Sequence, residues 1–317
     1  MGQGSAKVYD PQPSQQLFSP KSKTRRFSSG VATDIGGRPY QEDRFVLVDD
    51  LRSQFSSVTV PSALYIVLDG HGGQQCAEFV QSNFAEIFCA TEEFQMQDYS
   101  VAFRVTFQKL ETMWNAEALL QRIEGWSSGT CVLATLIVEE GVYVAWVGDC
   151  RMVGYSNHDV SHVQDITTDH KPSKPTEISR LIQAGANVQR AKLDGGCTCR
   201  NVYGPDRVFP GGLAIARSIG TIKCKDPKFG AVKGGIIAYP DIHFFNPKDG
   251  IRWLVMGSDG LWDYYPNSKQ LSKVVCRKKN DEMIDASEMS QYLMTTIRTS
   301  NSLRRAPDNA TILVLKL

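Results

Sequence analysis

The 317-residue sequence predicts an α+β fold in which helices cover a pair of sheets. Short runs rich in β-branched residues fit strands and lie near 43–48, 63–68, 130–138, 142–148, 251–257 and 310–316. Segments with helical periodicity are grouped between these runs. The chain is long enough for one large domain or two ordinary ones, and it can bury a sizeable core.

Residues 1–27 predict a flexible basic tail, because they are rich in Ser, Pro, Gln, Lys and Arg and have almost no aliphatic periodicity. The tail opens with Met1-Gly2-Gln3-Gly4-Ser5-Ala6, which is similar to an N-myristoylation signal except that Ala6 stands where the pattern has Ser or Thr. An acyl chain on Gly2 with the polybasic stretch would give peripheral membrane contact. A flexible leader without lipid is the equal alternative.

Two long helices are expected after the strand at 63–68. Apolar residues recur at three and four positions from Gln74 to Cys89, and the stretch 100–122 repeats the pattern. Pro175 and Gly185 bracket a shorter helix, and a final helical pair is expected between 267 and 300. The stretch 171–212 holds the short helix and then a polar, Gly-containing loop, so we interpret it as a candidate lid.

Charge and cysteine usage narrow the class of protein. The 35 Lys and Arg residues balance 34 Asp and Glu residues, so we expect no nucleic-acid partner. Cys76, Cys89, Cys131 and Cys276 lie within apolar patterns and no secretory signal is seen, which predicts reduced thiols in a cytoplasmic protein. No apolar stretch approaches the roughly 18 residues that span a bilayer. We expect a soluble monomer.

Three apolar runs end in an aspartate. The runs before Asp69 and Asp259 are followed at once by Gly70 and Gly260, and a third run ends at Asp149. Strands can deliver such carboxylates to a sheet edge, and a following glycine lets the backbone carbonyl join the ligands. Gathered carboxylates repel one another unless a cation binds, and oxygen ligands favour Mg²⁺ or Mn²⁺ over zinc. The sequence therefore predicts a hydrolytic centre with hard metal ions.

Other catalytic patterns are excluded. The segment Gly125-Trp126-Ser127-Ser128-Gly129 fits the serine-hydrolase elbow, but a helix-like segment precedes it and a strand follows, so we interpret it as a turn. None of the eight cysteines has an arginine six residues on, and Asp-x-Asp is absent. Cysteine-based and haloacid-type phosphatase chemistry are thereby excluded. The pair Cys197 and Cys199 lacks a second pair for a zinc site.

From about residue 28 to 317 the motifs resemble, in order, the metal-dependent type 2C protein serine/threonine phosphatase family. The matching blocks are Arg38-x3-Glu42-Asp43, Asp69-Gly70-His71-Gly72-Gly73, Ser128-Gly129-Thr130, Val147-Gly148-Asp149-Cys150-Arg151, Thr168-Asp169-His170-Lys171-Pro172, Leu213 to Ser218, Ser258 to Asp263 and Asp308-Asn309. The resemblance implies a four-layer α/β/β/α sandwich with two central antiparallel sheets flanked by helices, over a catalytic domain at 28–317. It also implies hydrolysis of phosphoserine and phosphothreonine on protein substrates without a phosphoenzyme.

The resemblance further implies the residues of the site. Asp69 is expected to bridge two Mn²⁺ or Mg²⁺ ions, which would share a water and lower its pKa to give hydroxide. The expected contributions of the other residues are the Gly70 carbonyl and, through water, Glu42 at one ion, Asp259 and Asp308 at the other, and Asp149 with Asp263 at a weaker third ion. Arg38 resembles the guanidinium that grips the phosphoryl group, and His71 resembles the general acid.

Two departures from the family pattern leave alternatives open. Thr221 stands where family members usually carry Asp, so we expect altered local hydrogen bonding with the metals retained and activity at or below the family's. The loop between Arg190 and Gly212 is longer than usual, which bears on substrate choice. A pseudophosphatase that keeps the fold as a scaffold and a hydrolase of small phosphate esters remain the alternative functions. The sequence leaves open the protein substrate and the choice between Mg²⁺ and Mn²⁺.

Overall fold

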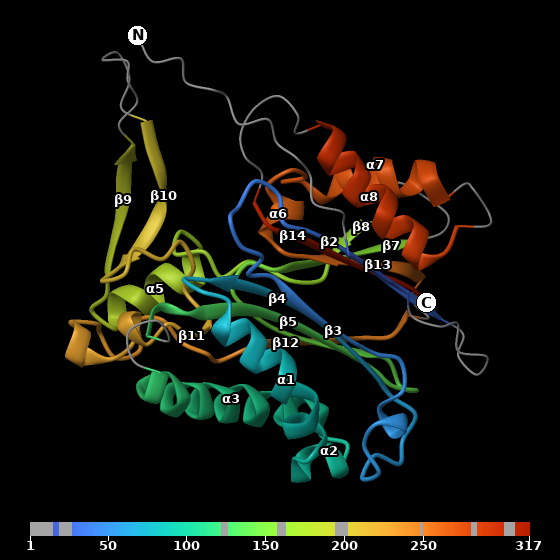
Figure 1. The fold of residues 1–317 in the computed structure, drawn as a ribbon, viewed down its shortest axis with the longest axis horizontal. Coiled ribbons are helices and arrows are strands. Elements are labelled where there is room, and N and C mark those ends of the chain that lie inside the picture. The colour runs from blue at the N-terminus through green and yellow to red at the C-terminus, as the bar shows by residue number, and fades with distance from the viewer. Residues whose placement is uncertain are drawn as a thin grey trace.

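Two antiparallel sheets face each other, and helices cover both outer faces (Figure 1). The computed structural model describes residues 15–18, 27–121, 126–156, 163–193, 202–247, 250–279, 284–300 and 308–317. The four-layer α/β/β/α sandwich is thereby confirmed. Gly2, Cys197 and Cys199 lie outside the described residues, as does the side chain of Cys276.

Each sheet is built from strands that lie far apart in the sequence. Sheet I has the order β1 (Gln15–Phe18), β2 (Ser28–Asp34), β14 (Ala310–Lys316), β13 (Ile251–Gly257), β7 (Arg151–Ser156), β8 (Val163–Asp165). Sheet II has the order β12 (Asp241–Phe245), β6 (Val142–Val147), β5 (Gly129–Ile137), β4 (Ala63–His71), β3 (Arg44–Val48), and the short β11 (Ile219–Gly220) pairs with β5.

The helices pack in pairs on the two sheets. α1 (Gln75–Cys89) and α3 (Tyr99–Gln121), with the short α2 (Glu92–Gln95), cover sheet II, and α7 (Ser268–Lys279) and α8 (Ala286–Ser300) cover sheet I (Figure 1). These helices match the predicted segments. The short α6 (Asp259–Trp262) follows β13 directly, and α5 (Pro175–Gln183) lies beside a hairpin of β9 (Asn187–Leu193) and β10 (Val202–Phe209).

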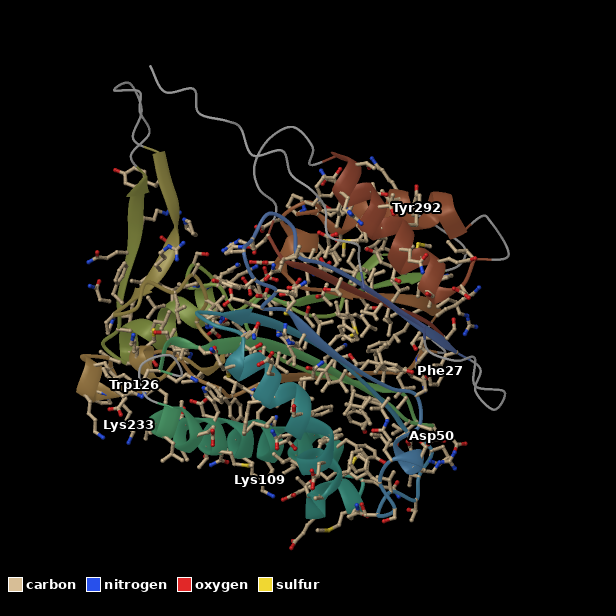
Figure 2. All side chains as sticks on the ribbon, in the orientation of Figure 1. Phe27, Asp50, Lys109, Trp126, Lys233 and Tyr292 are labelled. Carbon is tan, nitrogen blue, oxygen red and sulfur yellow. The ribbon has the colours of Figure 1, made fainter. Side chains whose placement is uncertain are left out.

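Strand β4 has both faces buried, which explains its unbroken apolar run. Ala63, Tyr65 and Val67 belong to the core between the sheets, whereas the alternate residues Leu64 and Ile66 pack under α1 and α3. Figure 2 shows side chains filling both spaces. Because successive side chains of a strand alternate between faces, Asp69 continues the row that points between the sheets. The strand therefore delivers a carboxylate to one end of the inter-sheet core.

The predicted loop of the candidate lid is wrong. Residues 187–193 and 202–209 pair as an antiparallel hairpin that projects from the sandwich (Figure 1). The polar, Gly-containing composition suggested a loop, but residues 202–209 form a strand whose register is irregular between Tyr203 and Asp206, around Gly204-Pro205.

The predicted tail contains one paired segment. Gln15–Phe18 form β1 and pair antiparallel with β2, whose outer edge would otherwise expose unpaired backbone groups. Within the globular part, Cys76, Cys89 and Cys131 are free and buried, as predicted. Among the described residues, no helix is long and apolar enough to cross a bilayer.

Candidate metal centre

Aspartates from the two sheets meet at one end of the inter-sheet core. Asp69 ends the apolar run of β4, and the backbone N–H of Asp259, at the start of α6, donates to Asp69 Oδ2 at 3.2 Å. Gly260 lets α6 pack against the start of β14, because a Cβ atom there would lie 2.2 Å from the backbone oxygen of Asn309. The predicted juxtaposition of the two Asp-Gly segments is therefore present.

A cavity of about 310 Å³ opens at this junction. Most of the sequence-predicted site residues line it, together with several that were not assigned a role. The lining residues are Arg38, Glu42, Asp43, Asp69, Gly70, His71, Gly72, Cys131, Asp149, Lys171, Arg207, Leu213, Ala214, Ile215, Asp259, Asp308 and Asn309. Asp263 is absent from this lining; its backbone N–H donates to the Asp259 carbonyl at 2.7 Å.

The carboxylates that line the cavity raise one another's pKa. Burial and the neighbouring Asp149 and Asp308 raise the pKa of Asp259 to about 8. Burial, followed by the charges of Asp259, Asp43 and Asp149, raises the pKa of Asp69 well above its usual value. A divalent cation would remove this repulsion, so the donor set fits hard metal ions.

Asp43 is a member of this cluster that sequence reasoning did not assign. It is buried, and the Ser258 hydroxyl donates to its Oδ2 at 2.7 Å. Burial raises its pKa to about 7 although the hydrogen bonds from Ser258 and Thr311 lower it. The adjacent carboxylates of Glu42 and Asp43 were the available signal, but nothing in the sequence distinguishes their depths.

Asn309 ties the segment that carries Arg38 and Glu42 to the entrance of β14. Its amide nitrogen donates to the backbone oxygens of Ile35 at 2.8 Å and Tyr40 at 3.0 Å, and its Oδ1 accepts from the Glu42 N–H at 2.8 Å. The motif Asp308-Asn309 thus supplies one cavity carboxylate and one positioning amide.

The resulting positions suit the expected roles of Arg38 and Glu42. Arg38 Nη2 donates to Asp308 Oδ2 at 2.5 Å, and its side chain is 53% exposed at the cavity. Glu42 Oε1 accepts from the Gly73 N–H at 2.6 Å. A Cβ atom at Gly70 would lie 2.3 Å from the Glu42 backbone oxygen, so only glycine allows these two segments to pack.

Asp149 faces a lysine and a thiol. Lys171 Nζ forms an ion pair with Asp149 Oδ2, and Cys131 Sγ donates to Asp149 Oδ1 at 3.1 Å. Burial lowers the pKa of Lys171, but the charge and hydrogen bond of Asp149 together with the charge of Asp169 outweigh it, and the net change is a rise. Lys171 was not assigned from the sequence, although it lies in the block that ends at Pro172.

Within the described residues, no three His, Cys, Asp or Glu side chains already form a coordination group. Asp149 faces Lys171, Asp308 faces Arg38, and Asp69 accepts from a backbone N–H. Binding of an ion at Asp149 or Asp308 would therefore require the cationic partner to move.

His71 contacts a neutral side chain at the cavity. Its Nε2 is 2.9 Å from the Thr221 hydroxyl oxygen, and it lines the cavity. Burial lowers the pKa of His71 to about 4, although the Asp149 charge raises it. The ring is therefore neutral near pH 7 in the ion-free protein.

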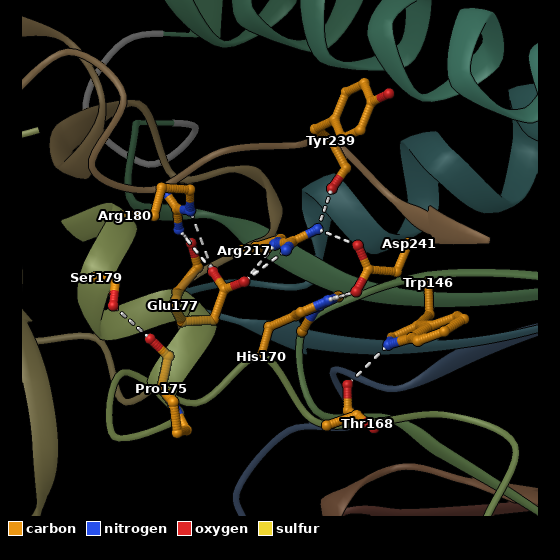
Figure 3. Close-up of polar contacts among 12 residues, drawn as sticks. Trp146, Thr168, His170, Pro175, Glu177, Ser179, Arg180, Arg217, Tyr239 and Asp241 are labelled. Atoms are coloured by element: carbon orange, nitrogen blue, oxygen red, sulfur yellow. Dashed lines mark hydrogen bonds and ion pairs between the residues drawn. The ribbon is translucent and has the colours of Figure 1, made fainter. Parts of the chain in front are cut away.

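A network of charged groups centred on the buried Glu177 supports the loop that carries Lys171. The Glu177 carboxylate of α5 accepts from Arg180 at 2.8 Å and from Arg217 at 2.5 Å (Figure 3). Arg217 also donates to Asp241 Oδ1 at 2.7 Å, and His170 Nε2 lies 3.2 Å from Asp241 Oδ2.

His170 connects this network to Gly148, the residue before Asp149. Its backbone N–H donates to the Gly148 carbonyl at 2.9 Å, and the Gly148 N–H donates to His170 Nδ1 at 3.1 Å. The network therefore fixes the neighbours of Asp149 and Lys171 without entering the cavity.

The elbow-like segment has a structural role. The Ser128 hydroxyl donates to the Gly73 carbonyl at 2.7 Å and accepts from the Cys76 N–H at 2.9 Å, and β5 begins at Gly129. The predicted strand after this segment is confirmed, whereas Trp126 and Ser127 are helical and Gly125 lies outside the described residues.

Comparisons with known proteins agree with this architecture. The family model "Protein phosphatase 2C" matches residues 34–304. "Probable protein phosphatase 2C 57" of Oryza sativa subsp. japonica is 28% identical over 295 residues, which cover 90% of this chain and 71% of the relative. "Probable protein phosphatase 2C 8" of Arabidopsis thaliana is 26% identical over 317 residues, which cover 98% of this chain and 84% of the relative.

Solved structures show the same fold. The serine-threonine phosphatase 2C from Toxoplasma gondii has a TM-score of 0.76 at 20% identity, with 96% of this chain and 99% of that chain covered. A C. elegans sex determining protein has a TM-score of 0.71 at 20% identity, with 93% and 66% covered. With the family model matching most of its length, this chain belongs to the protein phosphatase 2C family.

Proposed function

We propose that this chain hydrolyses phosphoserine and phosphothreonine in proteins with the help of two bound Mn²⁺ or Mg²⁺ ions. The observation that carries the proposal is the convergence of Asp69, Asp259 and Asp308 on one cavity, beside an exposed guanidinium. The raised pKa values of Asp69 and Asp259 support it, because burial and neighbouring carboxylates disfavour their charged forms and a divalent cation would stabilise them.

The ligands would divide between the two ions. Asp69 would bridge them, the Gly70 carbonyl and a water held by Glu42 would complete one site, and Asp259 and Asp308 would complete the other. When bound, the ions would supply a nucleophilic water near neutral pH and would screen the charge of the phosphate. Asp149 is the candidate for a weaker third ion, whereas Asp263, outside the cavity lining, is a candidate only for its outer ligands.

Arg38 would bind the phosphoryl oxygens. Its guanidinium lies at the cavity and is paired with Asp308, so an ion taken up by Asp308 would release the guanidinium for substrate. The planar fork of arginine suits two oxygens of a phosphate at once.

His71 would protonate the serine or threonine oxygen that leaves. A neutral ring cannot serve as the acid, so the substrate must restore the proton. A phosphate dianion beside the ring favours the imidazolium through its negative charge. The role therefore requires that substrate binding raise the pKa of His71 from about 4.

Phosphate release from a phosphothreonine peptide tests the proposal. We expect turnover that requires millimolar Mn²⁺, stops with chelator, and is lost in Asp259→Asn. Asp98→Asn, in an exposed residue before α3, is the matched control and should keep wild-type turnover. Absence of turnover in the folded wild-type protein with either metal would favour the scaffold function, and turnover of nitrophenyl phosphate alone would favour small phosphate esters.

A second assay separates the acid from the rest of the site. We expect His71→Ala to slow release from the phosphopeptide more than release from nitrophenyl phosphate, because nitrophenolate leaves without protonation. An equal loss on both substrates would contradict the acid role.

The location of the protein in the cell is a separate proposal that rests on sequence alone. We propose a cytoplasmic protein whose Gly2 is myristoylated and which contacts membranes through its basic tail. Gly2→Ala should then move the protein from the membrane fraction to the soluble fraction, and unchanged fractionation would contradict the lipid.

A further inference from the structure

Thr221 and His71 form a part-buried polar pair at the wall of the cavity. The hydroxyl oxygen of Thr221 lies 2.9 Å from His71 Nε2, and Thr221 is 3% exposed. Gly129 leaves the space for this contact, because a Cβ atom there would lie 1.9 Å from the Thr221 hydroxyl oxygen and 2.6 Å from His71 Nε2. The contact therefore depends on three residues from separate segments.

The backbone of Thr221 is in an unfavourable conformation for its side chain. Its φ of 58° and ψ of 52° lie in the left-handed region, which β-branched residues rarely adopt and which glycine, Asn and Asp adopt more readily. Two backbone hydrogen bonds hold it there: Thr221 N–H to Ser128 O at 2.8 Å, and Cys224 N–H to Thr221 O at 2.9 Å. Thr221 thus adopts a backbone conformation that threonine disfavours, which indicates that its side chain has a role at this position.

Helix α3 fixes the turn that carries Thr221. Glu111 Oε2 accepts from the Gly220 N–H at 2.8 Å, and its Oε1 accepts from Lys225 Nζ at 2.7 Å. Lys225 Nζ also donates to the Ser218 carbonyl at 2.7 Å. These hydrogen bonds connect the residues on both sides of Thr221 to α3. The turn therefore holds the Thr221 hydroxyl close to the His71 imidazole.

We propose that Thr221 is the positioning residue for His71. Its hydroxyl holds Nε2, and thereby sets the plane of the ring and, in the neutral ring before substrate binds, which nitrogen carries the proton. The inference rests on the proposed function for its consequence in turnover, but the contact itself can be tested without turnover. It also gives the departure from the family pattern at this position a role: a neutral hydroxyl that can donate or accept stands beside the ring.

Three substitutions separate the hydroxyl from the shape and the backbone strain. Thr221→Val keeps the β-branched shape and removes the hydroxyl, and Thr221→Ser keeps the hydroxyl. Thr221→Gly removes the hydroxyl and also relieves the left-handed conformation, so it keeps the test valid if the valine variant fails to fold.

The first readout is the nitrogen NMR spectrum of the His71 ring, assigned with His71→Gln. We expect the valine and glycine variants to change the tautomer populations of the ring and the serine variant to keep them. A spectrum that stays unchanged in the valine and glycine variants would overturn the proposal, whether or not the protein turns over a substrate.

The second readout is turnover of the phosphothreonine peptide with Mn²⁺. We expect kcat to fall about ten-fold in the valine variant with KM and Mn²⁺ affinity unchanged, a smaller fall on nitrophenyl phosphate, and recovery in the serine variant. In a His71→Ala background the valine substitution should cost nothing further, since the two residues then act as one unit. A serine variant as slow as the valine variant, or additive losses in the double variant, would overturn it.

An inactive wild-type protein would remove the proposed function and leave the NMR comparison of the valine and serine variants as the decisive test of positioning.

Discussion

Single carboxylates determine how the centre responds to protons and ions. Asp43 and Asp259 have pKa values of about 7 and about 8, because desolvation and neighbouring carboxylates disfavour their charged forms. At neutral pH the ion-free cluster therefore keeps protons that a divalent ion would displace. Proton release and ion uptake are thus coupled at the level of individual side chains.

The ion-free protein should lose stability as pH rises from about 4 to 8. Asp43 and Asp259 have raised pKa values in the folded protein, so the folded state binds more protons than the unfolded state in this window and unfolding becomes easier with pH. The gain in Tm from Mn²⁺ should be larger at pH 8 than at pH 5, since protons compete less. Thermal melts with chelator and with Mn²⁺ measure both; an ion-free Tm that rises through this window would contradict the cluster.

Asp259→Asn should make the ion-free protein more stable at pH 8. The amide removes a buried charge from a repelling group at nearly constant shape, and we expect a gain of about 1–3 kcal/mol in the free energy of unfolding. The same variant should lose most of the stabilisation by Mn²⁺. Urea unfolding with and without Mn²⁺ checks both parts, and a variant less stable than the ion-free wild type would contradict the repulsion.

Elements of the fold differ in how firmly they are tied to the site. Helix α5 is tied to the sandwich by the ion pairs of Glu177 with Arg180 and Arg217 (Figure 3). The hairpin β9–β10, in contrast, is a two-stranded sheet that projects away from the sandwich (Figure 1). Burial raises and the two arginines lower the pKa of Glu177, with a net fall, so its carboxylate is charged at neutral pH.

Removing the charge of Glu177 should destabilise the protein strongly. In Glu177→Gln the Arg217 guanidinium, whose side chain is 11% exposed, loses a buried carboxylate partner, and we expect a loss of about 3–5 kcal/mol in the free energy of unfolding. Asp206→Asn is the matched control, because its partner Arg190 is 61% exposed and such a pair contributes at most about 1 kcal/mol. Equal losses in both variants by urea unfolding would contradict the role of the network.

Backbone amides of the hairpin should exchange with deuterium much faster than those of β4 and β5. The central strands are buried on both faces, whereas the hairpin has open edges and, among its described side chains, contributes Val188 and Val208 to the small cluster beside α5. Hydrogen exchange followed by mass spectrometry gives the order of opening. Protection of residues 187–190 equal to that of 63–68 would contradict a hairpin that moves independently.

At the scale of the whole molecule, the packing of the two sheets decides which parts of the site the sequence could predict. The positions of Asp69 and Asp259 follow from strand patterns, because an apolar run that ends in Asp-Gly is a strand that delivers a carboxylate to the sheet edge. Asp43 and Lys171 did not follow, because their roles depend on contacts with Ser258 and Asp149 that form only when the two sheets pack.

The prediction of strands and helices was limited in the same way. Strands buried on both faces and amphipathic helices were predictable, since their periodicity reports burial. The hairpin β9–β10 has polar residues on both faces and a Gly204-Pro205 step. Its sequence therefore lacks the alternation of apolar and polar residues that would predict its strands. The motif order of the family supplied the sandwich that periodicity alone left unspecified.

The central claim is that carboxylates from both sheets hold two ions with Asp69 between them. Equilibrium dialysis against Mn²⁺, followed by metal analysis, tests it most directly in the wild type, Asp69→Asn and Asp308→Asn. The account predicts two tightly bound ions in the wild type, loss of both in Asp69→Asn, and loss of one in Asp308→Asn. A folded wild-type protein that binds no Mn²⁺, or an Asp69→Asn variant that still holds two ions, would contradict it.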